Sequence, residues 1–88
     1  MKVTNMKGKN GRTIPNQFVI DDKDYYLFQS YKSVIAKKYT NGKIKLDADM
    51  WDYSHTTSKY RNQFLDMTTK EIKAKIKSGE IELVDLNK

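Results

Sequence analysis

The chain has 88 residues, of which 38% are hydrophobic and 32% are charged, so we expect one domain, residues 1–88, with a small core. It contains no cysteine, which excludes a disulfide framework and a zinc site built on thiolates. No apolar run approaches the roughly 18 residues of a membrane span, and residues 1–12 lack the apolar segment of a secretory signal. We therefore expect a protein of the cytosol with no membrane partner.

The net charge of +6 points to a polyanionic partner. Residues 1–20 contain four basic residues and no acid, residues 31–45 contain five lysines and no acid, and residues 67–79 contain four lysines and one glutamate. A basic face built from these segments would attract nucleic acid, the commonest polyanion in a cell. The alternative is a lysine-rich surface that serves only solubility.

The N-terminal residues are compatible with two structures. In the first, Lys2–Met6 is a strand that pairs with Thr13–Ile20 across a turn at Gly8–Gly11. In the second, residues 1–12 are a flexible basic arm that can lie along phosphates. Pro15 cannot donate to a β-ladder, so a strand that contains it is expected at an edge.

Three apolar runs after this segment predict further strands. Phe18–Ile20 and Tyr25–Phe28 flank the polar turn Asp21–Asp24, which indicates a hairpin. Val34–Tyr39 is the next predicted strand, and it leads into Asn41-Gly42.

The Asn41-Gly42 pair favours a two-residue type I′ turn. Such a turn would place Tyr39 opposite Ile44 and would set two lysines, Lys38 and Lys45, opposite each other. One face of this hairpin would then carry Ile35, Tyr39, Ile44 and Leu46.

The stretch Trp51–Leu65 contains the only tryptophan and the only histidine, and there the apolar pattern changes from strand to helix. Trp51 is predicted to fill the core or to cap its end. Candidate N-caps of the helix are Ser54, Thr56, Thr57 and Ser58. Tyr60, Phe64 and Met67 then recur at helical spacing.

A second helix is predicted to follow at once. Thr68 and Glu71 match a capping box, and Gly79 suits the residue after the last helical turn. Glu80–Leu86 then resembles a final strand. The predicted fold is α+β, with a small antiparallel sheet of about four or five strands and one or two short helices packed on one face.

Residues with catalytic chemistry are scarce. His55 could act with Asp52 or a nearby hydroxyl, but a single histidine in a polar turn is more often a surface or capping residue. There is no glycine-rich phosphate loop, no zinc-ligand spacing and no nucleophile elbow. We therefore predict no enzyme activity, no catalytic residue, no metal site and no cofactor.

Tyrosines interleave with lysines in the middle of the chain. Basic side chains hold phosphates while aromatic rings stack on bases, although tyrosine is also a common half-buried residue of strands. The predicted contact residues in this region are Lys32, Lys37, Lys38, Lys43, Lys45, Tyr31 and Tyr39. Arg61 is added as a further partner contact, because Tyr and Arg are also enriched at the hot spots of protein interfaces.

Four stretches, Phe28–Ala36, Trp51–Leu65, Ser78–Glu80 and Asp85–Asn87, carry a resemblance that covers about residues 14–87. In them the chain resembles a group of small uncharacterised proteins of tailed phages and prophages of Gram-positive bacteria. The resemblance implies a phage setting and the cytosol of a host cell. It implies no activity and no functional residue. Small phage proteins of this size are often accessory factors that bind nucleic acid or block a host complex.

Two functions are therefore expected as alternatives. The first is a non-enzymatic accessory protein that binds nucleic acid through a basic face. The second is a protein inhibitor, similar to an anti-CRISPR factor, that docks on a host nucleoprotein or defence complex. The first predicts an affinity that falls steeply with salt, and the second predicts one defined partner and a modest salt dependence.

Overall fold

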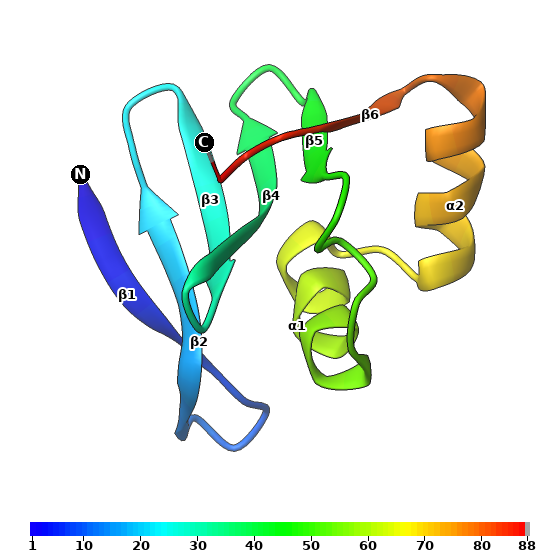
Figure 1. The fold of residues 1–88 in the computed structure, drawn as a ribbon. Helices are drawn as coiled ribbons and strands as arrows, with labels where there is room; N and C mark the ends of the chain where they lie inside the picture. Colours follow the sequence, from blue (N-terminus) through cyan, green and yellow to red (C-terminus); the bar gives the residue numbers. More distant parts are fainter. Residues whose placement is uncertain (88) are drawn as a thin grey trace.

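The computed structural model describes residues 1–87, which form one sheet and two helices (Figure 1). In chain order the elements are β1 (Lys2–Lys7), β2 (Thr13–Asp21), β3 (Tyr25–Ser30), β4 (Ser33–Tyr39), β5 (Ile44–Asp47), α1 (His55–Leu65), α2 (Thr69–Ser78) and β6 (Ile81–Val84). The predicted α+β class is confirmed, with six strands in the sheet instead of four or five.

The six strands lie side by side in chain order. The first five pair antiparallel, because short turns join each strand to the next. β6 pairs parallel to β5, since the chain between them crosses over through α1 and α2 before it returns. The predicted antiparallel sheet is therefore a mixed sheet, and local turn signals do not specify its parallel pair.

β1 and β2 form the hairpin of the first N-terminal alternative. Gly8 N donates to Arg12 O at 2.9 Å, and Gly11 N donates to Gly8 O at 3.0 Å, which closes the turn. β2 lies between β1 and β3, so the expectation of an edge strand is wrong. Pro15 is tolerated because it precedes the pairing with β3, which begins at Gln17, so no ladder N–H is needed from it on that side. Residues 2–7 belong to the sheet and do not form a separate arm.

A bulge sets the register between β3 and β4. Phe28 pairs with Ala36, whereas the next residue of β3, Gln29, pairs with Val34. Ile35 is therefore the extra residue on β4. Its side chain is fully buried, so the bulge adds an apolar group to the core.

The turn at Asn41-Gly42 is present, but its loop contains three residues instead of two. Tyr39 N donates to Lys43 O at 2.8 Å, and Gly42 alone in this loop has a positive φ, +93°. A type I′ turn needs positive φ at two successive residues, which this loop does not have.

The extra loop residue shifts the pairing of β4 and β5. Lys37 lies opposite Lys45, and Lys38 lies opposite Ile44. The predicted register, with Tyr39 opposite Ile44 and Lys38 opposite Lys45, is wrong by one residue. Because side chains alternate along a strand, this shift places Tyr39 on the opposite face from Ile44.

α1 begins after one of its four candidate N-caps, and α2 begins and ends at the predicted residues. Ser54 caps α1 by accepting a hydrogen bond from Thr57 N at 3.1 Å. α2 begins with the capping box of Thr68 and Glu71, and it ends at Gly79 with a φ of +86°. Within residues 1–87 neither helix is long and apolar enough to cross a bilayer.

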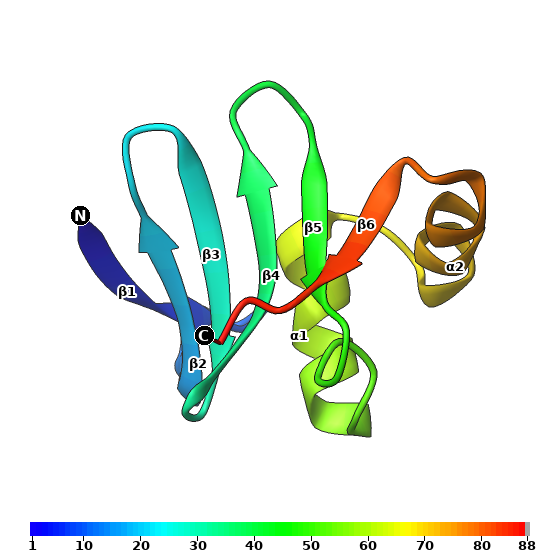
Figure 2. The same ribbon diagram turned by 45° about the horizontal axis from the view of Figure 1, so that its top comes forward.

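The core lies between α1 and one face of the sheet. Phe28 of β3 stacks on Phe64 of α1, with ring centroids 5.8 Å apart, and Trp51 packs against the core while partly exposed. The buried apolar residues are Met6, Phe28, Ile35, Ala36, Ile44, Leu46, Leu65, Ile72 and Ile81. Figure 2 shows α1 behind the sheet, α2 beyond β6, and the segment after β6 crossing in front of β4. Within residues 1–87, no helix covers the front face.

Candidate nucleic-acid interface

The strand register defines the face of the sheet that α1 does not cover. One row of paired residues crosses this face from β1 to β6: Val3, Ile20, Leu27, Lys37, Lys45 and Glu82. Phe18, Tyr25 and Tyr39 point to the same side by alternation along their strands. We call these nine residues the open face. Except for Val3 and Glu82 at its two ends, their side chains are half-buried by one another.

Two tyrosines and two lysines of the open face form one group. Lys37 Nζ lies 4.2 Å from the ring centroid of Tyr25 and 4.9 Å from that of Tyr39. Lys45 Nζ lies 5.8 Å from the centroid of Tyr39, and the two rings meet edge to face at 6.3 Å. We call these four residues the Tyr–Lys cluster. Within residues 1–87 neither lysine forms an ion pair, so both ammonium groups are available to an anion.

The position of Tyr25 is fixed by the turn before it. Its hydroxyl donates a hydrogen bond to the carboxylate of Asp22, and this bond raises the pKa of Tyr25. The pKa of Asp22 is lowered, first by the hydrogen bond from Lys23 N and then by that from Tyr25. The phenol oxygen of Tyr25 therefore lies near the Asp22 carboxylate at the rim of the sheet.

Three of the predicted contact residues, Lys37, Lys45 and Tyr39, lie together in the Tyr–Lys cluster. The fourth member, Tyr25, was not among the predicted site residues. Its alternation with Leu27 along β3 indicates the face on which it lies. Its pairing with Tyr39 depends on the bulge between β3 and β4, which the sequence does not reveal.

The other predicted residues of the central region lie apart from the Tyr–Lys cluster. Lys43 is exposed at the base of the β4–β5 loop, opposite Tyr39. Lys38 points to the α1 side of the sheet, because it pairs with Ile44. Tyr31 and Lys32 occupy the β3–β4 turn at the far end of the strands, where Tyr31 is 53% exposed.

Arg61 was predicted as a partner contact, but in the structure its side chain is not accessible to a partner. Its side chain in α1 is fully buried. The guanidinium donates hydrogen bonds to Trp51 O, Asp52 Oδ1, Ser58 Oγ, Asn62 Oδ1 and Thr69 Oγ1. A buried cation with this many hydrogen-bond acceptors stabilises the fold and does not contact a partner. The helical pattern of the sequence did not reveal that it faces inward.

Asp52 is the carboxylate that balances Arg61, at 3.2 Å. Partial burial raises the pKa of Asp52, but the hydrogen bonds from Ser58 and Arg61 together with the charge of Arg61 outweigh burial, so the net shift is downward. The charged form of Asp52 is therefore favoured, and its contacts with Ser58 and Arg61 hold the segment before α1 against this helix.

His55 stands at the first position of α1 with an exposed side chain. Within residues 1–87 it has no hydrogen bond or ion pair, whereas its neighbours have other contacts: Asp52 Oδ1 accepts from Arg61, and Ser54 Oγ accepts from Thr57 N. The same residues contain no group of three or more His, Asp or Glu side chains that could hold a metal ion.

The β1–β3 half of the open face is apolar. Val3, Ile20 and Leu27 follow one another in the row across the sheet, and Phe18 lies beside Ile20 on β2. Val3 is 59% exposed. The open face therefore changes from an apolar half on β1–β3 to a basic, aromatic half on β3–β5.

Comparison with known proteins identifies the family of this chain. Residues 1–81 match the model of a family of unknown function, DUF8033. No curated protein and no solved structure matches the chain. The chain belongs to the DUF8033 family, whose description specifies no activity.

Proposed function

We propose that this member of a family of unknown function is a small, non-enzymatic, phage-type accessory protein that binds single-stranded nucleic acid in the cytosol of a host cell. The observation that carries the proposal is the Tyr–Lys cluster, in which Lys37 and Lys45 flank two tyrosine rings on the open face. The net charge of +6 supports the same class of partner.

The cluster supplies the two contacts that a single strand needs. An exposed part of a tyrosine ring stacks on a base and contributes about 1–3 kcal/mol for each base. Lys37 and Lys45 sit on neighbouring strands, directly opposite each other, and each neutralises a phosphate and releases its counterions. A strand running across β4 and β5 would meet both kinds of contact.

A single strand fits this surface better than a duplex. Stacking on Tyr25 or Tyr39 requires a base whose face is free, and the bases of a duplex are stacked on one another. Within residues 1–87 the open face also presents no helix that could enter a major groove (Figure 2). We therefore expect tighter binding to single strands than to duplexes of the same length.

The experiment is a fluorescence titration of labelled single-stranded and duplex oligonucleotides at several salt concentrations. The double variant Lys37→Gln/Lys45→Gln should bind more weakly, and the slope of log K against log salt should become shallower by about 1.4, or about 0.7 for each phosphate that is no longer neutralised. The control variant is Lys70→Gln/Lys77→Gln, which removes two exposed lysines of α2. An equal decrease in affinity for both variants would contradict a specific role for the cluster.

A second candidate is a protein inhibitor that docks on a host nucleoprotein or defence complex, in the manner of an anti-CRISPR factor. The apolar half of the open face, with Val3 59% exposed, favours it. Tyrosine beside apolar residues is typical of interface hot spots. Absence of oligonucleotide binding at low salt, together with capture of one host protein that Leu27→Lys abolishes, would support this candidate in place of nucleic acid.

A further inference from the structure

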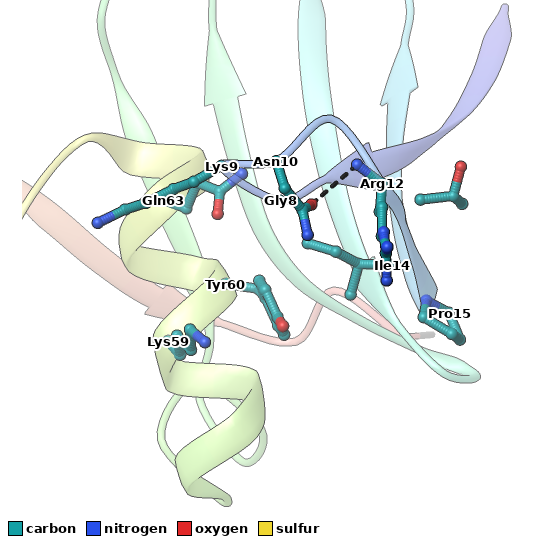
Figure 3. Close-up of a pocket in the computed structure, with 10 residues that line it drawn as sticks. Gly8, Lys9, Asn10, Arg12, Ile14, Pro15, Lys59, Tyr60 and Gln63 are labelled. Atoms are coloured by element: carbon teal, nitrogen blue, oxygen red, sulfur yellow. Dashed lines mark hydrogen bonds between the residues drawn. The ribbon is translucent and has the colours of Figure 1, made fainter.

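A groove separate from the open face lies between the β1–β2 turn and α1 (Figure 3). It has a volume of about 570 Å³, which is within the roughly 300–1,000 Å³ of small-molecule sites. The turn and the start of β2 form one wall, and Lys59, Tyr60 and Gln63 of α1 form the other. Because α1 forms that wall, the groove opens on the side of the sheet opposite the Tyr–Lys cluster.

The charge of the groove has one sign. Its lining includes Lys9, Arg12 and Lys59 and no acidic residue. Within residues 1–87 none of the three cations forms an ion pair. Figure 3 shows Arg12 on the hairpin wall and Lys59 on the helix wall, with Tyr60 and Ile14 between them. A cleft lined by one sign of charge concentrates ions of the other sign.

The floor of the groove is apolar and aromatic. Ile14 and Tyr60 are both half-buried and pack against the core. Lys59 Nζ lies 5.4 Å from the ring centroid of Tyr60, so a cation stands beside an aromatic surface. A ligand that combines a flat apolar group with an anion would satisfy both the floor and the walls.

Hydrogen bonds hold the two walls in place. Gln63 Nε2 donates to Lys7 O at 3.0 Å and ties α1 to β1. Within the hairpin, Asn10 Oδ1 accepts from Arg12 N at 3.0 Å, and Asn5 Nδ2 donates to Ile14 O at 3.2 Å. The groove is therefore formed before any ligand arrives, which lowers the ordering cost of binding.

We propose that this groove binds a nucleoside phosphate, with the base against Tyr60 and Ile14 and the phosphate between Arg12 and Lys59. Arg12 provides a planar fork that matches two phosphate oxygens, and Lys59 provides a mobile point charge. The ligand is either a free mononucleotide or the phosphorylated end of a strand. This site does not depend on the Tyr–Lys cluster, and either can exist without the other.

The test is NMR titration of the whole chain with a nucleoside monophosphate, with the unphosphorylated nucleoside and with inorganic phosphate as separate probes. The monophosphate should shift the amide signals of Ile14, Tyr60 and Gln63 more than either fragment does. Arg12→Gln/Lys59→Gln should weaken binding at least about tenfold, because the variant removes two charge-assisted hydrogen bonds to the phosphate. A 5′-phosphorylated oligonucleotide that moves the same signals would identify a strand end as the source, and one that does not would identify the free nucleotide.

Matched variants separate this site from the proposed function. The affinity of the groove is read from the signals of Ile14, Tyr60 and Gln63, which lie away from the Tyr–Lys cluster, and Lys70→Gln/Lys77→Gln should leave it unchanged. Both substituted groove residues are exposed, and an unchanged thermal midpoint would show that the fold persists. Three results would overturn the proposal: no shifts at millimolar monophosphate, equal binding of inorganic phosphate, or an unchanged affinity of Arg12→Gln/Lys59→Gln.

Discussion

The guanidinium of Arg61 lies 5.2 Å from the centre of the Trp51 ring and donates a hydrogen bond to the backbone carbonyl of the same residue. One side chain of α1 thus holds both the ring and the main chain of the segment before α1. Thr69 at the start of α2 accepts from the same guanidinium. Arg61 therefore joins the segment before α1, α1 itself and the start of α2.

We expect Arg61→Lys to lower the free energy of unfolding by about 2–4 kcal/mol, because lysine keeps the buried charge but cannot reach this many acceptors. The measurement is the urea midpoint and slope, followed by circular dichroism. Arg12→Lys is the matched control, since Arg12 is exposed and its change should be near zero. A midpoint of Arg61→Lys equal to that of the control would contradict the structural role of Arg61.

Acid should weaken the contact between Asp52 and Arg61. The folded-state pKa of Asp52 is below its ordinary value, so its stabilising effect is complete above the unfolded pKa of about 3.9 and is lost as the pH falls through the folded value. Urea midpoints of the wild type should therefore fall below about pH 4. Asp52→Asn should be less stable at neutral pH and should lose part of this acid dependence.

Other carboxylates with lowered pKa values, those of Asp22, Glu71 and Glu80, will leave some acid dependence in Asp52→Asn. The comparison is therefore with a second variant, Asp24→Asn, which removes an exposed carboxylate. If both variants have the same pH profile, the contact between Asp52 and Arg61 does not contribute to acid stability.

The element types were predictable because local chemistry specifies them. The capping residues Thr68 and Gly79 are at the predicted places, and Ser54 is one of the four candidate N-caps of α1, since a cap depends only on residues within one turn. The parallel pairing of β6 with β5 was not predictable, because it depends on the path of two helices and on burial of Ile81 beside Ile44.

The candidate site was predictable only in composition. Residues 31–45 were identified as basic and aromatic, but a one-residue error at Gly42 placed Lys38 beside Lys45 and Tyr39 on the core side. Whether Asn41 takes a positive φ, and so whether the loop has two or three residues, depends on the flanking strands. The burial of Arg61 was not predictable either, because a cation is rarely buried unless several acceptors from distant parts of the chain converge on it.

The positive φ of residue 42 is predicted to require glycine at this position. Its φ is +93°, and a Cβ added there would have open space around it, so any cost comes from the backbone. We expect Gly42→Val to lower the free energy of unfolding by about 1–2 kcal/mol. At Gly8 an added Cβ would make ordinary contact with Asn10 at 3.5 Å, so Gly8→Ala should have little effect. Equal thermal midpoints for the two variants would disprove the strain at Gly42.

Lys37 should contribute little to stability, so that weaker binding by its variants does not reflect unfolding. Lys37→Gln removes two cation–π contacts, each about 0.5–1 kcal/mol at exposed sites. It also removes the unfavourable pairing with Lys45, which costs about 0.2–1 kcal/mol. The net decrease in the free energy of unfolding should therefore be at most about 2 kcal/mol. Phe28→Ala, on the buried side of the adjacent strand, should cost about 3–5 kcal/mol in the same urea assay.

The side chain of Asn87 links the C-terminal segment to β4. Asn87 Oδ1 accepts from Val34 N at 2.7 Å, and Asn87 Nδ2 donates to Val34 O at 3.0 Å. The amide thus pairs with both backbone groups of a residue beside the β4 bulge, as a neighbouring strand would.

We expect Asn87→Ala to lower the free energy of unfolding by about 1–2 kcal/mol and to speed hydrogen exchange at the Val34 amide. Asn87→Asp keeps the acceptor for Val34 N but removes the donor to Val34 O, so it should retain most of the protection at this amide. If Asn87→Ala and the wild type exchange this proton at the same rate, the segment does not depend on Asn87, and the neighbouring bond from Leu86 N to Asp47 Oδ1, at 2.8 Å, is sufficient to hold it.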